Sequence, residues 1–124
     1  MSTIIYQPYV YDDGDEITCR ATAPVTLGHL LGVSGDRAGG NINVAHATAG
    51  GRTLGVAGSD ATTGQLVVAY SGGIIRAVAG ANITAGTAVE VGAAGTVIPA
   101  TTGTVVGLAV ASAGNGALAE IKLY

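Results

Sequence analysis

Five side chains of this sequence could in principle form a hydrolytic centre, because they comprise one thiol, two imidazoles and two carboxylates. A thiolate becomes an effective nucleophile when an imidazole takes its proton and a third group orients that imidazole. The five residues are Cys19, His29, Asp36, His46 and Asp60. No G-x-S-x-G motif accompanies them, and Cys19 lies in a run, EITCRA, that is typical of a strand. We predict that Cys19 is a small buried core residue and that the chain is not an enzyme.

Metal and phosphate sites are also not expected. His29 and His46 have no further His or Cys at ligand spacing, so each is predicted to lie at the surface or at a subunit interface. The acids of Tyr11–Glu16 do not alternate as the oxygen ligands of a calcium loop do, and we interpret this segment as a solvated turn around Gly14. No Lys-Ser or Lys-Thr follows the glycine-rich segments. No catalytic, cofactor-binding or metal-binding residue is therefore assigned.

The elements that would carry these residues are short runs rich in Val, Ile and Thr, separated by glycine-containing turns. Such runs are typical of strands. The ten runs are 16–21, 29–33, 41–47, 53–58, 65–71, 73–80, 87–92, 95–100, 104–111 and 118–124. No segment keeps apolar residues at helical spacing for three turns, so at most one helical turn is expected, around Thr84–Thr87. The pattern predicts an all-β, single-domain fold resembling a β-barrel or β-sandwich, with almost no helix.

Two of these runs differ in their periodicity. In the last run Ala119, Ile121 and Leu123 alternate with Glu120 and Lys122, which is typical of a half-buried strand. The run Thr104–Ala111, TVVGLAVA, is apolar on both faces instead. We expect it to be a central strand covered on both sides, by the core and by a neighbouring loop or subunit.

The two halves of the chain resemble each other weakly. Thr26–Val33 is similar to Thr84–Val91, and Val44–Leu66 is similar to Val97–Leu118. One interpretation is that two related halves close a single barrel or sandwich around a pseudo-two-fold axis. The alternative is that two segments rich in glycine and alanine match by composition alone.

Composition limits both the core and the partners of the chain. Of its 124 residues 48% are hydrophobic, yet none is Phe or Trp and 21 are glycine, so we expect a thin core that gains from a partner surface. Charged residues make up 10% and the net charge is −3, which does not suit binding to nucleic acid. Neither a membrane span nor a signal peptide is expected. The single cysteine fits assembly in a reducing cytoplasm.

The C-terminal part, NITAGTAVEVGAAGTVIPATTGTVVGLAVASAGNGALAEIKLY, resembles the small capsid cement, or head decoration, proteins of tailed phages. The similarity lies in the T-x-G turn at Thr84–Gly86, the G-x-V-x-P-A segment at Gly95–Ala100, the strand at Val105–Ala113 and the closing strand at Leu118–Tyr124. The opening DDGDEITCRATAPVTLGHLLGV is similar to the family's first strand and turn. The resemblance implies a β-rich homotrimer that binds the major capsid protein outside the lattice and stabilises it, in a virion assembled in the host cytoplasm.

The first residues carry most of the tyrosines and much bulky apolar area. Tyrosine is common at interfaces, and a chain terminus orders only where it is held. We therefore predict an extended N-terminal arm, residues 1–14, that contacts the capsid or a neighbouring subunit, ahead of a β-barrel-like domain at 15–124. The candidate interface residues are Ile4, Ile5, Tyr6, Tyr9, Val10 and Tyr11. The alternative function is a domain of a phage tail fibre or a bacterial surface adhesin.

Overall fold

The computed structural model describes residues 16–124, apart from the side chain of Ala38, and this part of the chain forms ten strands and one short 3-10 turn. Each of the ten predicted runs coincides with one strand, although β2 continues beyond its run to Ala38, so the all-β prediction is confirmed. The strands are β1 (Ile17–Ala21), β2 (Leu30–Ala38), β3 (Asn41–His46), β4 (Gly55–Ala57), β5 (Leu66–Tyr70), β6 (Ile74–Val78), β7 (Ala88–Val91), β8 (Val97–Pro99), β9 (Gly107–Ala109) and β10 (Leu118–Leu123).

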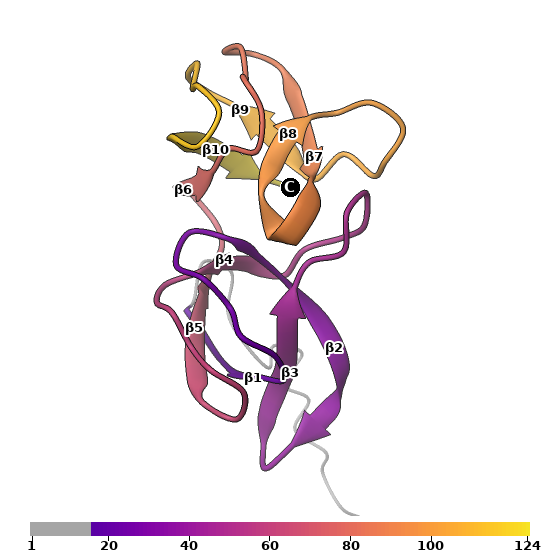
Figure 1. Cartoon of the computed structure of the whole chain (residues 1–124), viewed down its shortest axis with the longest axis vertical. Helices are drawn as coiled ribbons and strands as arrows, with labels where there is room; N and C mark the ends of the chain where they lie inside the picture. Colours follow the sequence, from indigo (N-terminus) through magenta and orange to yellow (C-terminus); the bar gives the residue numbers. More distant parts are fainter. Residues whose placement is uncertain (1–15) are drawn as a thin grey trace, which may run out of the picture.

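Two β lobes are stacked along the long axis of the molecule, with the indigo-to-magenta half below the orange-to-yellow half (Figure 1). In the N-terminal lobe the strands form a closed barrel in the order β1-β3-β2-β4-β5. In the C-terminal lobe they form a five-stranded sheet in the order β6-β10-β9-β7-β8. Residues 71–73 connect the two lobes.

Both lobes have the same topology, which supports the internal repeat over a chance match of composition. The antiparallel pairs β1–β5, β2–β3, β2–β4 and β4–β5 recur as β6–β10, β7–β8, β7–β9 and β9–β10. The turn ahead of the second strand also recurs: His29 N donates to Thr26 O and Thr87 N donates to Thr84 O, both at 3.1 Å. Gly28 and Gly86 give these turns the left-handed φ that they require, 82° and 84°.

The expectation that both halves would close one barrel together is wrong, because each half pairs its strands within itself. In the N-terminal lobe β1 runs parallel to β3 over three residue pairs and closes the barrel. In the C-terminal lobe the equivalent contact is one parallel bridge, Ala79↔Val97. The residues just before β8 form the 3-10 turn η1 (Ala93–Gly95), where Ala94 and Gly95 take left-handed φ angles of 54° and 75°. The helical turn allowed for Thr84–Thr87 is not formed, because these residues make a tight turn instead. Among the described residues the one helical turn is η1.

The two lobes share part of their core. One buried cluster fills the barrel, and the other lies in the C-terminal lobe but includes Leu30, Ala47 and Val56 of the N-terminal lobe. Backbone hydrogen bonds join the lobes as well, since Gly50 N donates to Val91 O at 2.8 Å. The buried apolar side chains of the described residues are Val, Leu, Ile, Ala and Cys, as the composition predicted, and the carboxylate of Glu90 is buried with them. Within residues 16–124 no helix is long and apolar enough to span a membrane.

The run TVVGLAVA is shorter as a strand than predicted, and within the single chain it is covered on one side. Its cover by a neighbouring subunit stays a prediction. β9 spans Gly107–Ala109 between β7 and β10, with Gly107 and Ala109 buried and Leu108 half-buried. The flanking Val105 and Val110 are 42% and 43% exposed. The alternation predicted for β10 is confirmed, since Ala119 and Ile121 are buried while Lys122 is exposed.

Candidate interaction surface

The thiol of Cys19 is enclosed in the barrel of the N-terminal lobe, and its residue is fully buried. Burial raises the pKa of this thiol, although the nearby charge of Arg37 opposes the shift. A thiol held in its neutral form is a poor nucleophile. The interpretation of Cys19 as a core residue is therefore confirmed.

The two histidines, each predicted to lie at the surface or at a subunit interface, are stacked on each other with ring centroids 5.0 Å apart. The Nε2 atom of His46 accepts a hydrogen bond from the backbone N–H of Thr26 at 3.0 Å, and His29 Nδ1 bonds the carbonyl oxygen of Ala94 in the other lobe. Desolvation, and then the neighbouring His29, lower the pKa of His46. No group of three His, Cys, Asp or Glu side chains that could hold a metal ion occurs among the described residues. The pair is thus a structural contact at the lobe junction.

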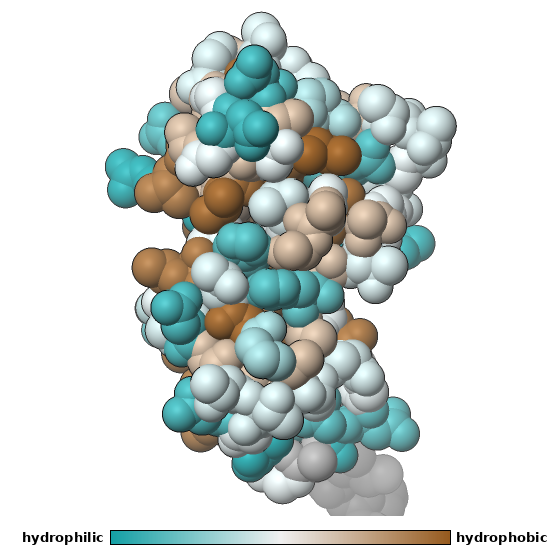
Figure 2. Space-filling view, in the orientation of Figure 1, coloured by the Kyte–Doolittle hydropathy of each residue, from teal (hydrophilic) through white to brown (hydrophobic). Residues whose placement is uncertain are grey.

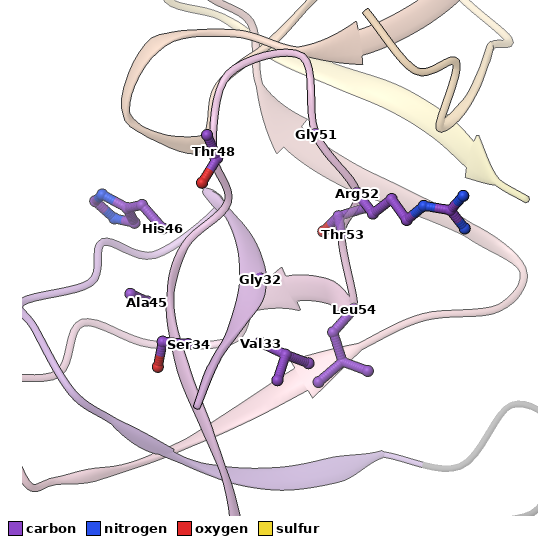
Figure 3. Close-up of a pocket in the computed structure, with 10 residues that line it drawn as sticks. All are labelled: Gly32, Val33, Ser34, Ala45, His46, Thr48, Gly51, Arg52, Thr53 and Leu54. Atoms are coloured by element: carbon purple, nitrogen blue, oxygen red, sulfur yellow. The ribbon is translucent and has the colours of Figure 1, made fainter. Parts of the chain in front are cut away.

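An open pocket beside the barrel contains His46 but no converging set of reactive groups. It lies against β2, β3 and the loop before β4 (Figure 3). In this view the imidazole of His46 points to one side and the guanidinium of Arg52 to the other. Cys19 is not among the lining residues, so the condition that a hydrolase would need, Cys19 meeting His46 in a pocket, is not met here.

A second concavity, which we call the junction groove, runs between the two lobes. From the N-terminal lobe it is lined by Leu27, Gly28, Val56, Ala57, Gly58 and Tyr70. From the C-terminal lobe it is lined by Ile74, Ile75, Arg76, Val78, Leu118 and Glu120. Figure 2 shows hydrophobic side chains gathered at the left of the waist where the lobes meet.

The groove exposes large apolar side chains that a free protein would ordinarily bury. Leu27, Ile74 and Leu118 are more than half exposed, and Tyr70 is 39% exposed with its ring against Gly58. Contiguous exposed apolar surface with a polar rim is typical of an interaction site. The polar rim here is Arg76 and Glu120, which face each other in the β6–β10 register.

These groove residues were missed in the sequence, although two of them carry a signal there. Ile74 and Leu118 lie on the same strand face as a charged residue two positions further along: Arg76 in β6 and Glu120 in β10. An apolar residue on a charged strand face is a candidate contact residue. Leu27 and Tyr70 have no such signal, because they lie in a turn and at a strand end.

The candidate interface residues predicted from the sequence, Ile4, Ile5, Tyr6, Tyr9, Val10 and Tyr11, lie outside the described residues. The same holds for the predicted acidic turn except Glu16, the first described residue. The described chain enters β1 beside the junction groove, since Ile17 pairs with Ala69, the neighbour of groove residue Tyr70.

Comparison with known proteins gives this surface its context. The family model of phage cement proteins matches residues 11–123. The crystal structure of the head fibre gp8.5 N base in bacteriophage phi29 is similar, with a TM-score of 0.76 and 29% identity over 89% of this chain and 93% of that chain. A comparison with curated proteins finds no match. The match over most of its length shows that the chain belongs to the phage cement protein family, whose members are structural proteins that stabilise the capsid.

Proposed function

We propose that the chain acts as a homotrimer that binds the major capsid protein on the outside of the virion and has no enzymatic activity. The observation that carries this proposal is the family match over residues 11–123. The buried thiol of Cys19 and the diverging side chains of the open pocket favour a role without catalysis. Assembly in the host cytoplasm is part of the proposal and is supported by the single unpaired cysteine.

The mechanism is adhesion. A trimer bridging capsid subunits adds buried surface across their joints and thereby opposes their separation. Each trimer engages several sites at once, so modest contacts of each copy combine into tight binding. The exposed apolar side chains of the junction groove fit such a role, because shape and apolar area, more than reactive groups, determine this kind of contact.

We propose that the chain consists of an N-terminal arm, residues 1–14, and a β domain, residues 15–124. The arm supplies the main contact residues, Ile4, Ile5, Tyr6, Tyr9, Val10 and Tyr11. Two observations support this: the arm holds three of the five tyrosines, and residues 16–124 form two buried clusters among themselves.

Deletion of residues 2–11 tests the role of the arm. We expect the truncated chain to keep the circular dichroism of a β protein, because the barrel and the second sheet are formed by residues 16–124. Its binding to mature capsids in a sedimentation assay should fall by about tenfold or more, since a few buried aromatic anchors carry most of an interface's energy. A truncated chain that saturates capsids at the parent's concentration would refute the proposed contact.

A matched control distinguishes the loss of apolar area from the loss of charge. The double variant Asp12→Asn/Asp13→Asn changes neighbouring residues without removing apolar area, and it should bind capsids within a few-fold of the parent. Light scattering on purified protein tests the trimer, and particle images of decorated capsids test it on the lattice. A chain that is monomeric in solution and sits singly on capsids would contradict the trimer.

A further inference from the structure

The stacked pair of His29 and His46 makes hydrogen bonds that depend on where its rings carry protons. The backbone N–H of Thr26 donates to Nε2 of His46 at 3.0 Å, so this nitrogen must be without a proton. The carbonyl oxygen of Ala94 can only accept, so Nδ1 of His29 carries the proton of that bond. The ring centroids are 5.0 Å apart. The arrangement therefore requires a neutral His46.

These bonds meet in the turn at Thr26–His29, which lies just before β2 and reaches the C-terminal lobe twice. His29 bonds Ala94 in η1, and the carbonyl oxygen of Gly28 accepts a hydrogen bond from the backbone N–H of Val78 in β6 at 2.8 Å. The side chain of His46 thus supports one end of a turn whose other end joins the two lobes.

The corresponding turn of the C-terminal lobe forms without histidines. In the repeat, Thr87 stands at the position of His29, and Pro99 stands at the position of His46 in the matched strand registers. Both lobes nevertheless make this turn with the same backbone hydrogen bond. The imidazole pair is therefore not needed to form the turn and is an addition of the N-terminal lobe at the junction.

The elements around the pair carry four other charged residues: Asp36 and Arg37 on β2, Arg52 on the loop before β4 and Asp60 on the loop after β4. Asp36 and Arg37 lie at the hairpin end of β2, away from the pairing with His46. The guanidinium of Arg52 points away from His46 (Figure 3), and Asp60 accepts a hydrogen bond from the backbone N–H of Leu27 at 2.7 Å. Among the described residues no acid forms an ion pair with either imidazole. A proton on His46 would therefore have no compensating charge beside it.

We propose that the stacked pair of His29 and His46 is a pH-sensitive switch of the lobe junction, which holds the lobes together while His46 is neutral. When Nε2 of His46 takes up a proton, it becomes a donor that faces the N–H donor of Thr26. Two donors cannot bond each other, so the turn moves away from His46. A charge on both stacked rings adds repulsion to this effect.

The movement of the turn weakens both of its contacts with the C-terminal lobe, the one of Gly28 with Val78 and the one of His29 with Ala94. The junction groove changes with them, because Leu27 and Gly28 line it. The switch goes beyond the proposed function, since it concerns how the two lobes of one chain are held together.

The switch acts in mild acid. Desolvation, and then the neighbouring His29, lower the pKa of His46 from its ordinary value of 6.5. The unfolded chain therefore takes up this proton at a higher pH than the folded chain does. The stability that neutral His46 provides is complete above pH 6.5 and is lost as pH falls from 6.5 to the folded pKa. The chain has two histidines, both in this pair, so no other type of side chain has its ordinary pKa in this range.

Amide hydrogen exchange on the free full-length chain, compared as protection factors at pH 7 and pH 5, tests the switch. The protection factors of the Thr26 and Val78 amides should fall at least about tenfold at pH 5, because both lose their acceptors. The amide of Ile83, which donates to the carbonyl oxygen of Ala113 at 2.8 Å within the C-terminal lobe, is the internal control and should change little. Unchanged protection of Thr26 and Val78 would overturn the proposal. Loss at Thr26 alone would overturn it as well, because the change would then end within the turn.

His46→Gln is the matched variant, because its amide oxygen can accept the Thr26 hydrogen bond and does not titrate. Thr26 and Val78 should then keep the same protection at both pH values. A variant that loses protection at pH 5 as the parent does would refute the role of His46.

Titration of the imidazole resonances in the parent, followed by nuclear magnetic resonance, tests the switch without any substitution. The protonation of His46 should have its midpoint below pH 6.5, and the protection of Val78 should fall over the same pH range. Protection lost while His46 is still neutral would also refute the switch. These measurements use the protein without capsids, so their outcome is independent of the proposed function.

Discussion

Glu90 is a buried carboxylate, 3% exposed, on β7 where the lobes meet. It accepts hydrogen bonds from the hydroxyl of Thr101 at 2.7 Å and from the backbone N–H of Thr101 at 2.8 Å. The Thr101 hydroxyl, followed by backbone N–H groups of Thr101 and Gly103, lowers the pKa of Glu90 against the opposing effect of burial. Gly103 packs so closely that a Cβ there would overlap the carboxylate. A single acid thus organises the loop at 100–104.

The stability of the protein should therefore fall in acid through Glu90. Because its folded pKa lies below the ordinary value of 4.5, the ionised carboxylate stabilises the fold above that pH, and this contribution is lost as pH falls through the folded pKa. Glu90→Gln should lower the melting temperature by several degrees at pH 7, and its difference from the parent should shrink below pH 4.5. Glu120→Gln, on the outer face of β10, is the control. A difference in melting temperature between the parent and Glu90→Gln that stays the same at every pH would contradict this role.

At the scale of the strand, Gly107 shows why glycine interrupts an apolar run. A Cβ at this position would lie 2.6 Å from the carbonyl oxygen of Lys122 on β10. The equivalent residue of the other lobe, Gly55, would meet the carbonyl oxygen of Tyr70 at the same 2.6 Å. Backbone atoms of a paired strand cannot move aside easily, so these glycines permit the close approach of two strands.

Gly107→Val should cost about 1–3 kcal/mol of unfolding free energy through overpacking. Denaturant unfolding measures this value, and Gly55→Val should give a similar one. Gly35→Val is the matched control, because no atom lies within 4 Å of a Cβ at that strand position. Equal stability of the Gly107 and Gly35 variants would show that the strands separate at no cost.

The strands could be predicted from the sequence, whereas their partners could not. Val, Ile and Thr runs between glycines marked all ten strands because that signal is local. The stacking of His29 on His46 depends on the register of β2 against β3. In this register Leu31 pairs with His46, and two irregularities, between Val33 and Gly35 and between Gly35 and Ala38, separate this pair from the hairpin end. Bulges of this kind leave no clear mark in one sequence. Likewise, the left-handed φ angles of Ala94 and Gly95 in η1, just before β8, have no local signal in the sequence.

At the scale of the whole molecule, neighbouring leucines at the start of β2 tie the lobes together. Leu30 packs in the cluster of the C-terminal lobe, and Leu31 packs in the barrel, both fully buried. The chain crosses between lobes once, yet each lobe's core needs side chains that β2 supplies. A thin core of Val, Leu, Ile and Ala leaves little stability to either lobe alone. We therefore expect the lobes to unfold together.

Leu30→Ala tests this coupling, because it removes a side chain of the barrel's own strand from the core of the other lobe. The substitution should lower the free energy of unfolding by about 2–5 kcal/mol, as large-to-small substitutions in cores do. Leu31→Ala should lower it by a similar amount. Calorimetry should record one transition for the parent and for both variants, with the midpoint lowered to a similar extent. Leu66→Ala, at a 53% exposed position, should leave the midpoint almost unchanged. A Leu30→Ala variant that melts in two steps, with the barrel retaining the parent's midpoint, would show that the lobes fold independently and that the groove between them is an accident of their connection.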